Sequence, residues 1–300
     1  MLQWLFDLTL APPGALPRLA HRVRRRLTRV WNPEVRWSLE GRTLAVPLSH
    51  DFAWNRGLFP GYTDNLRRVA AFLRARDGAV GFIDVGANIG DTYLLTRPAP
   101  GDRALLVEGA AHYFGLLVRN VGRDPGVTCV RALLSDRESA AAGGIVYEGG
   151  NARIDPTVGG DSAFETLDGV LARHPGSVTP TLIKVDVEGY DVRVLRGARG
   201  LLSTHAPVVM FEHHPRLIDA IGDDPAVVFA DLAALGYGTL LVYDNFGALL
   251  GTLEPRDLEG IARLIETARR RDGYYHDLIA FPERRAADRK AFLAAECARA

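Results

Sequence analysis

The sequence is poor in cysteine, lysine and methionine. Its two cysteines, Cys129 and Cys297, lie far apart and match no metal-binding spacing. So few cysteines argue against a disulfide framework and fit a reducing compartment. Lysine occurs only at Lys184 and Lys290, whereas the other 34 basic residues are arginine. We attribute this bias to genome base composition, and we expect a bacterial source.

Net charge and long hydrophobic runs are also missing. The 36 basic residues balance 36 acidic ones, so no overall field would attract nucleic acid, and we expect no nucleic-acid partner. No apolar stretch reaches the roughly 20 residues that a membrane-spanning helix needs. The first residues, MLQWLFDLTLAPPG, lack the basic start of a signal peptide. These features predict a cytoplasmic protein, and they say nothing about its oligomeric state.

The first sixty residues differ in character from the rest. The segment RLAHRVRRRLTRVW (residues 18–31) mixes arginines with apolar residues. It is either a solvated helix face or a peripheral contact with an anionic surface such as the inner membrane. The segment VRWSLEGRTLAVPL (residues 35–48) alternates around a Glu40-Gly41 turn, which favours a β-hairpin. We therefore expect a helix and hairpin extension over residues 1–60 and the main domain over residues 61–300.

After a predicted helix within residues 61–78, short apolar strands alternate with helical segments, which is typical of an open α/β sheet. The expected strands are Ala79–Val85, Ala104–Glu108, Val127–Arg131, Thr181–Val187, Val208–His213, Thr239–Tyr243 and Asp277–Phe281. The expected helices are Thr92–Thr96, Ala110–Val121, Thr166–His174, Asp191–Ser203, Pro225–Leu235 and Pro255–Arg271. Nearly continuous apolar strands indicate a mostly parallel sheet with helices on both faces. The glycine-rich segment 140–161 interrupts this order and predicts a loop or small hairpin near the site.

A glycine turn follows the first strand of the main domain. The stretch FIDVGANIG (residues 82–90) places Asp84 and Gly86 at a carboxyl strand end, where ligands bind in such sheets. Gly86 and Gly90 allow a tight turn and a close approach to a ligand. The spacing is not the dinucleotide G-x-G-x-x-G, and a carboxylate at Asp84 would repel a pyrophosphate. A cationic ligand suits this turn better.

An acid also ends the second strand, in LLVEGA. Glu108 lies 24 residues after Asp84, close to the spacing at which an acid accepts hydrogen bonds from ribose hydroxyls. A ligand with a ribose, a cation and no pyrophosphate has the profile of S-adenosylmethionine. The alternative is that the two acids only cap strand ends.

A second group of charged residues lies in TLIKVDVEGYDVRVLRGA (residues 181–198). Lys184, Asp186 and Glu188 alternate with valines and therefore share one face. They form either a paired structural cluster or part of a ligand cleft, and we favour the cleft. The next strand ends in Glu212, His213 and His214. A histidine beside a carboxylate is a natural general base. No tight ligand spacing supports zinc, so we assign no metal ligands.

Taken together, these motifs resemble the FkbM-type methyltransferases, a branch of the class I enzymes that depend on S-adenosylmethionine. The resemblance rests on FIDVGANIGDT, LLVEGA, Asn120, ALLSD, TLD, LIKVDVEGYDVRVLRGA and PVVMFE, which occur in family order. The segment KVDVEG followed by VLRGA is the most specific part. Upstream, GRTLAVPLSHDF resembles family members found with cell-envelope glycan synthesis, and this part of the resemblance is weaker.

The resemblance implies a Rossmann-like class I methyltransferase sandwich with a seven-stranded, mostly parallel sheet. It further implies that the cofactor turn consists of Asp84, Gly86, Ala87, Asn88 and Gly90. In the same way, Glu108 would hold the ribose, and Ser135 and Asp136 would lie near the adenine. Family members commonly methylate hydroxyl oxygens of sugars or polyketide-type products, so the resemblance implies O-methylation, here in polysaccharide biosynthesis.

The implied reaction is an in-line attack of a hydroxyl on the methyl group, helped by positioning and by a base. We expect His213 or Glu188 to be that base and Asp186 to bind or orient the acceptor. One alternative is an oxidoreductase that binds NAD, and another is a binding protein that kept the fold without activity. A third is a metal-assisted methyltransferase in which Asp186, Glu188 or His213 holds Mg²⁺. The acceptor and its hydroxyl position are not indicated by the sequence.

Overall fold

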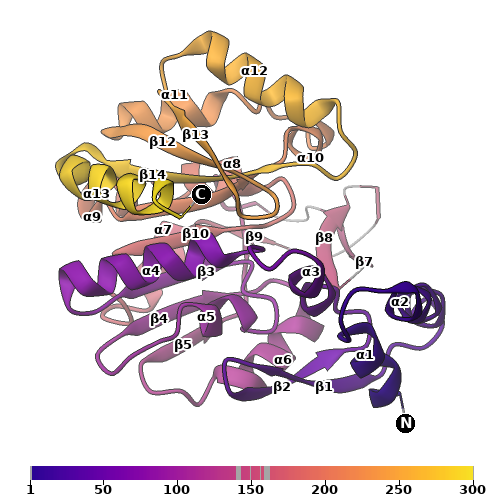
Figure 1. Ribbon diagram of the computed structural model, residues 1–300. Coiled ribbons are helices and arrows are strands. Elements are labelled where there is room, and N and C mark those ends of the chain that lie inside the picture. The colour runs from indigo at the N-terminus through magenta and orange to yellow at the C-terminus, as the bar shows by residue number, and fades with distance from the viewer. Residues whose placement is uncertain (1, 140–142, 149, 156, 159–162, 300) are drawn as a thin grey trace.

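The chain folds around one large β-sheet, as seen in a computed structural model (Figure 1). The structure describes residues 2–139, 143–148, 150–155, 157–158 and 163–299. From one edge to the other, the sheet consists of β13 (Leu249–Leu253), β12 (Tyr237–Asp244), β14 (His276–Pro282), β11 (Val208–His213), β10 (Leu182–Val185), β3 (Gly81–Val85), β4 (Arg103–Val107) and β5 (Val127–Val130). The strands β11, β10, β3, β4 and β5 are parallel, and β14 runs antiparallel between β11 and β12.

All seven expected strands are present, and the α/β fold class is confirmed. The sheet has one strand more than expected, because the chain turns at Gly247 after β12 and returns as β13. Gly247 has a φ of +85°, and a Cβ there would lie 2.0 Å from the carbonyl oxygen of Gly61. The hairpin therefore depends on a glycine at this position.

Helices cover both faces of the sheet. One face carries α4 (Asp64–Asp77), α5 (Asp91–Leu95), α6 (Ala111–Val121) and α13 (Ala286–Cys297). The other carries α7 (Leu167–Arg173), α8 (Asp191–Arg196), α9 (Arg199–His205), α10 (Pro215–Ala220), α11 (Val227–Ala234) and α12 (Leu258–Arg269). A short 3₁₀ helix, η1 (Glu283–Arg285), precedes α13. Neighbouring strand residues point to opposite faces, so Phe82 belongs to one core cluster and Ile83 to the other. This arrangement explains the continuous apolar strands.

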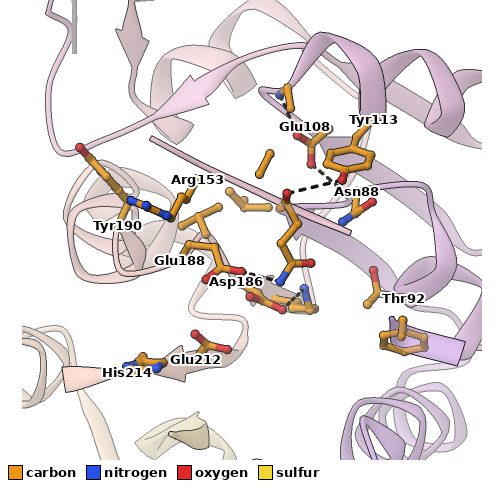
Figure 2. Close-up of a pocket in the computed structure, with 18 of the residues that line it drawn as sticks. Asn88, Thr92, Glu108, Tyr113, Arg153, Asp186, Glu188, Tyr190, Glu212 and His214 are labelled. Atoms are coloured by element: carbon orange, nitrogen blue, oxygen red, sulfur yellow. Dashed lines mark hydrogen bonds and ion pairs between the residues drawn. The ribbon is translucent and has the colours of Figure 1, made fainter. Parts of the chain in front are cut away.

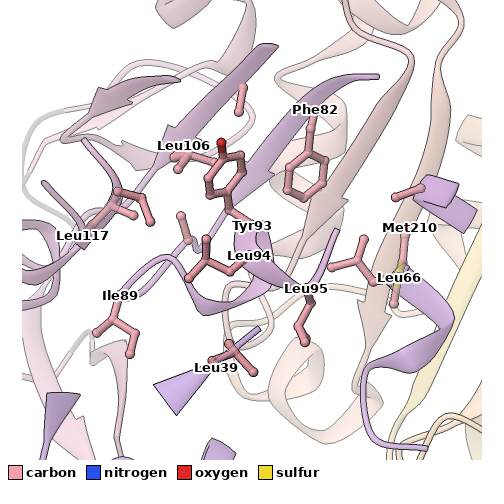
Figure 3. Close-up of a cluster of buried hydrophobic side chains, with 14 of the residues drawn as sticks. Leu39, Leu66, Phe82, Ile89, Tyr93, Leu94, Leu95, Leu106, Leu117 and Met210 are labelled. Atoms are coloured by element: carbon pink, nitrogen blue, oxygen red, sulfur yellow. The ribbon is translucent and has the colours of Figure 1, made fainter. Parts of the chain in front are cut away.

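The first part of the chain forms α1 (Gln3–Thr9), α2 (Ala15–Leu27), β1 (Glu34–Leu39), β2 (Arg42–Pro47) and α3 (Phe52–Leu58). The expected hairpin is present as β1 and β2. Its Leu39 joins Leu66 of α4, Phe82 of β3 and Met210 of β11 in one core cluster (Figure 3). The division into residues 1–60 and 61–300 stays a prediction, and the two parts share this core.

The glycine-rich segment forms a hairpin of β7 (Gly144–Glu148) and β8 (Asn151–Asp155), while its residues 140–142, 149, 156 and 159–161 lie outside the described residues. A further two-stranded sheet pairs β6 (Leu133–Leu134) with β9 (Phe164–Glu165). No helix in the described part of the chain has both the length and the apolar character needed to cross a bilayer.

The expected helix over Asp191–Ser203 is two helices, α8 and α9, which is a correction. The break falls at Gly197, where a Cβ would lie 2.1 Å from the carbonyl oxygen of Ser135. A glycine, which is a poor helix former, therefore stands at the break and lets the Ser135 segment approach closely.

Candidate active site

A cavity of about 750 Å³ opens where β3, β4, β10 and β11 end. Its size falls within the range of small-molecule sites. In Figure 2, Asn88 and Glu108 lie on one side, Glu212 and His214 on the opposite side, and Asp186 and Glu188 between them. The site therefore forms at the strand ends that the sequence indicated.

The glycine turn needs glycines because neighbouring segments pack closely against it. Gly86 and Gly90 have φ values of +81° and +91°. A Cβ on Gly86 would lie 1.9 Å from the Asp186 carbonyl oxygen, and one on Gly90 would lie 2.8 Å from a methyl group of Val121. The turn thus requires both glycines for the approach of neighbouring segments. Gly86 lines the cavity, whereas Gly90 and the fully buried Ala87 do not.

Glu108 and Asn88 form the polar edge beside this turn. One Glu108 oxygen accepts the Ala110 N–H at 2.7 Å, and the other accepts the Asn88 N–H at 2.9 Å. Asn88 adopts a positive φ of 47° and donates its side-chain amide to the Gly150 carbonyl at 3.0 Å. Burial raises the pKa of Glu108 to about 7, although the two backbone N–H groups oppose this rise. The side-chain oxygen of Asn88 is buried and has no partner among the described residues.

Asp84 lies beneath the cavity and does not line it, so the expected direct contact with a cationic ligand is not what the structure shows. Its side chain is fully buried and accepts a hydrogen bond from the Thr92 hydroxyl. The Lys184 ammonium lies 3.4 Å away. Burial raises the Asp84 pKa, and the positive charge of Lys184 partly counters that effect. Asp84 therefore supports Thr92 and Lys184, which do reach the cavity.

Lys184 forms ion pairs with two acids, Asp186 on its own strand end and Asp84 on the neighbouring strand β3. Its ammonium lies 3.2 Å from Asp186 and 3.4 Å from Asp84. Burial disfavours the charged lysine, but Asp186 and Asp84 outweigh it and hold the Lys184 pKa above its ordinary value. Asp186 remains 41% exposed and lines the cavity. The structural pairing and the cleft position, which the sequence left as alternatives, thus coexist.

Glu188 and Glu212 reach the cavity from the ends of β10 and β11. Glu188 has a φ of 54°, and its carboxylate accepts a hydrogen bond from the Asn151 amide at 2.6 Å. The Glu212 carboxylate has no hydrogen-bond or ion-pair partner among the residues that the structure describes. Burial raises the Glu212 pKa well above its ordinary value, and the nearby negative charges of Asp186 and Glu188 add to the rise.

His213 is a correction, because the structure places it on the opposite face of the sheet. Its side chain is fully buried, packs against Phe229, and its Nε2 lies 2.9 Å from the Pro225 carbonyl. Burial lowers the His213 pKa to about 4. Period-two alternation instead brings Met210, Glu212 and then His214 to the cavity. We therefore withdraw His213 as the base.

Ser135 and Asp136 do not reach the cavity either. The Ser135 hydroxyl lies 3.1 Å from Asp136, and the Ser135 backbone N–H is bonded to the Glu165 carbonyl. The preceding Leu133 and Leu134 line the cavity instead. These two leucines give an apolar wall near the position expected for the adenine.

Several cavity residues were missed by the sequence analysis. Asp277 is the second residue of β14, whose antiparallel direction brings its first residues to the carboxyl ends of the parallel strands, and it pairs in register with Glu212. Burial raises the Asp277 pKa to about 7. Tyr275 and Phe52 of α3 also line the cavity, and the Tyr275 hydroxyl oxygen lies 3.5 Å from that of Tyr62, which the sequence offered either as a sugar-stacking or as a core residue. The signal for Asp277 was an acid at the start of the last strand.

Metal ligation does not fit the residues found. Within the ranges that the structure describes, no group of three or more histidine, cysteine, aspartate or glutamate side chains is arranged to hold a metal ion. We therefore derive no step through Mg²⁺.

This chain is similar to several methyltransferases of known structure. Among solved structures, the FkbM methyltransferase from Methylobacillus flagellatus KT is 18% identical, with a TM-score of 0.38. That alignment covers 54% of this chain and 39% of the other, so this chain spans less than two thirds of that relative. An O-methyltransferase from Bacillus cereus in complex with SAH is 11% identical over 72% of this chain and 80% of its own, with a TM-score of 0.40. The comparison with curated proteins gave no match.

The family comparison is decisive. The model for the methyltransferase FkbM domain matches residues 84–238, just over half of the chain. The matched range begins at Asp84, spans the glycine turn and Glu108, and runs through Asp186, Glu188 and Glu212. This protein is therefore a member of the FkbM methyltransferase family.

Proposed function

We propose that this methyltransferase transfers a methyl group from S-adenosylmethionine to a hydroxyl group of a sugar, in a cell-envelope glycan or a related product. The observation that carries the proposal is one cavity with two different walls. The wall at the glycine turn presents Glu108 and Asn88, and the wall at β11 and β14 presents Glu212 and Asp277. One wall suits a nucleoside, and the other suits a molecule rich in hydroxyl groups.

The first wall fits S-adenosylmethionine. Each Glu108 oxygen accepts one backbone N–H and retains a lone pair for a ribose hydroxyl. The Asn88 side-chain oxygen is a buried acceptor without a partner in the described residues, and a bound ligand would satisfy it. The acids Asp186 and Glu188 suit the positive sulfonium and ammonium groups. S-adenosylmethionine would supply a methyl group already activated by its bond to a sulfonium sulfur.

The second wall fits a neutral sugar. Carboxylates such as Asp186, Glu212 and Asp277 are strong hydrogen-bond acceptors for hydroxyl groups. The rings of Phe52 and Tyr62 give flat apolar surfaces beside them. Acids outnumber the bases Arg153 and Lys184 in the cavity lining, which disfavours an anionic acceptor and makes neutral polyhydroxyl compounds the favoured class.

Glu212 is our candidate for the base that takes the hydroxyl proton. Asp186 is paired with Lys184, and Glu188 accepts a hydrogen bond from Asn151, whereas no described residue pairs with the Glu212 carboxylate. Its raised pKa makes its carboxylate a stronger proton acceptor than an ordinary glutamate. Glu188 remains the second candidate, and Asp186 would orient the acceptor.

Calorimetric titration with S-adenosylhomocysteine tests the cofactor part of the proposal. We expect micromolar-range binding that Glu108→Ala abolishes. Binding of NAD in its place would support the oxidoreductase alternative, and binding of neither would support the non-catalytic alternative. Transfer of labelled methyl from S-adenosylmethionine to neutral sugars, followed by location of the label on oxygen, then tests the acceptor class.

A further inference from the structure

Helix α2 exposes an apolar stripe that the rest of the protein leaves uncovered. The helix packs on the protein through Pro17, Ala20 and Arg24. Its Leu16, Leu19 and Val23 are 59%, 55% and 48% exposed. Their spacing of three and four residues places them on one line along the helix. A helix that only met solvent would carry polar residues there.

Other large apolar side chains are exposed in the same part of the chain. Helices α1 and α2 pack together at one edge of the molecule, near the N-terminus (Figure 1). Trp4 of α1 is 62% exposed, and Val30 and Trp31, just after α2, are 91% and 48% exposed. Tryptophan is enriched where a protein meets the membrane interface, because its ring is apolar and its N–H is polar.

Arginines accompany the stripe. Arg18, Arg22 and Arg26 follow one another at four-residue spacing, are exposed, and form no ion pair with any described residue. Residues 8–33 contain six arginines and no acidic residue, although the whole chain has no net charge. The positive charge is therefore concentrated beside the apolar stripe.

We propose that α2, with Trp4 and Trp31, binds the surface of an anionic lipid bilayer. Apolar side chains beside arginines match the layered chemistry of that surface, with acyl chains below and negative headgroups above. A second copy of this chain fits less well, because a twofold contact through α2 would bring the same arginines face to face. The proposal does not depend on the proposed function. If both hold, the acceptor is a lipid-linked glycan.

The structure ties α2 to the active-site cavity. The buried Arg24 pairs with Asp51 and donates to the His50 carbonyl at 3.4 Å. His50 in turn lies 2.9 Å from Asp91, the first residue of α5 after the glycine turn. A membrane-bound α2 would therefore hold the cavity at a fixed orientation to the lipid surface.

Co-sedimentation of the full chain with vesicles tests the proposal. We expect binding to vesicles of phosphatidylglycerol and phosphatidylcholine, weak binding to phosphatidylcholine alone, and weakening by added salt. Arg18→Gln/Arg22→Gln/Arg26→Gln should lower the partition coefficient about 100-fold, at roughly a factor of five for each arginine near the surface. Leu16→Ser/Leu19→Ser/Val23→Ser should lower it at least about tenfold.

Matched controls use exposed residues elsewhere. Arg256→Gln/Arg263→Gln/Arg270→Gln and Val118→Ser/Leu250→Ser/Leu258→Ser should bind like the wild type. The proposal is wrong if the wild-type protein does not bind anionic vesicles. It is also wrong if all the variants bind them equally well. Light scattering measures the oligomeric state. If the wild type is a dimer and Leu16→Ser/Leu19→Ser/Val23→Ser is a monomer, the stripe binds a second copy of the chain instead.

Discussion

At the residue scale, Glu108 connects cofactor binding to pH. Its pKa lies near 7, above the ordinary glutamate value, so its carboxylate is protonated below that pH and ionised above it. Ribose hydroxyls donate best to the ionised form. We expect the affinity for S-adenosylhomocysteine to rise as pH increases through about 7, and calorimetry between pH 6 and 8 measures this.

Glu108→Gln should remove that pH dependence and weaken binding about 10- to 100-fold, since a charge-assisted hydrogen bond contributes roughly 1.5–3 kcal/mol. The glutamine side chain also has one oxygen for two backbone donors. Asp136→Asn is the control, because Asp136 lies outside the cavity and its replacement should leave affinity unchanged. If Glu108→Gln binds S-adenosylhomocysteine as tightly as the wild type does, Glu108 does not bind the ribose.

Glu212 gives the second residue-scale prediction, on turnover. Glu212→Gln keeps the size of the side chain but removes the proton acceptor, so kcat should fall about 10²- to 10⁴-fold with little change in cofactor affinity. His213→Leu should keep kcat within about threefold of the wild type per folded molecule, because His213 faces away from the cavity. The reverse pattern would restore the histidine as the base.

The change of candidate base from His213 to Glu212 shows what the sequence could and could not predict for the site. Both residues end the same strand, and their chemistry alone favoured the histidine. Period two was visible, and it links Glu212 to Met210 on one face and His213 to Phe211 on the other. Which face held the ligand depended on helix packing, and only the three-dimensional arrangement decided it.

At the element scale, Asn120 of α6 joins the N-terminal hairpin to the glycine turn. Its side-chain oxygen accepts the Ala45 N–H at 2.9 Å, and its amide donates to the carbonyls of Ala45 and Ile89, each at 3.0 Å. One side chain thus satisfies the edge of β2 and the backbone between Asn88 and Gly90. In this chain, an asparagine that carries part of the family resemblance therefore has a linking role in the fold.

Asn120→Ala should lower the free energy of unfolding by about 2–3 kcal/mol, because it leaves these partly buried backbone groups unpaired. Urea unfolding measures this effect. We also expect weaker cofactor binding, since Ile89 lies within the turn. Arg119→Ala, one residue earlier and exposed in an ion pair with Glu34, is the control and should cost under about 1 kcal/mol. If both variants lose the same free energy of unfolding, Asn120 does not link the hairpin to the glycine turn.

Strands and the hairpin followed from the sequence better than helices did. Continuous valine and leucine runs fixed the positions of seven strands, since a buried parallel strand allows few other residues. The break between α8 and α9 was not predicted, although it falls at Gly197, a poor helix former against which the Ser135 segment, far away in sequence, packs closely. Helix α13 has a weak apolar pattern and was missed, although Phe292 packs into the main core.

At the scale of the whole molecule, the site collects more negative charge than its surroundings compensate. Glu212, Asp191 and the partly buried Asp277 lie close enough to Asp186 to feel its negative charge, and burial raises the pKa of each. Such a cluster costs stability when it is ionised, and a cationic ligand would relieve it. The sequence indicated acids at three strand ends, but their convergence with Asp277 required the antiparallel β14.

Asp277→Asn tests this cost through the pH dependence of folding. The folded pKa of about 7 exceeds the ordinary value of 3.8, so the contribution of Asp277 is most favourable below pH 4 and is lost as pH rises through 7. Asparagine imitates the protonated acid at every pH and can keep the hydrogen bond with Asn65. The variant should therefore become more stable than the wild type by about 2–4 kcal/mol as pH increases from 4 to 8. Thermal or urea unfolding across that range measures the difference, and Leu258→Ser, an exposed neutral change, should differ from the wild type by a constant amount. If the stability gain of Asp277→Asn over the wild type instead decreases as pH rises, the folded protein stabilises Asp277 as a carboxylate. The site would then not carry an excess of negative charge.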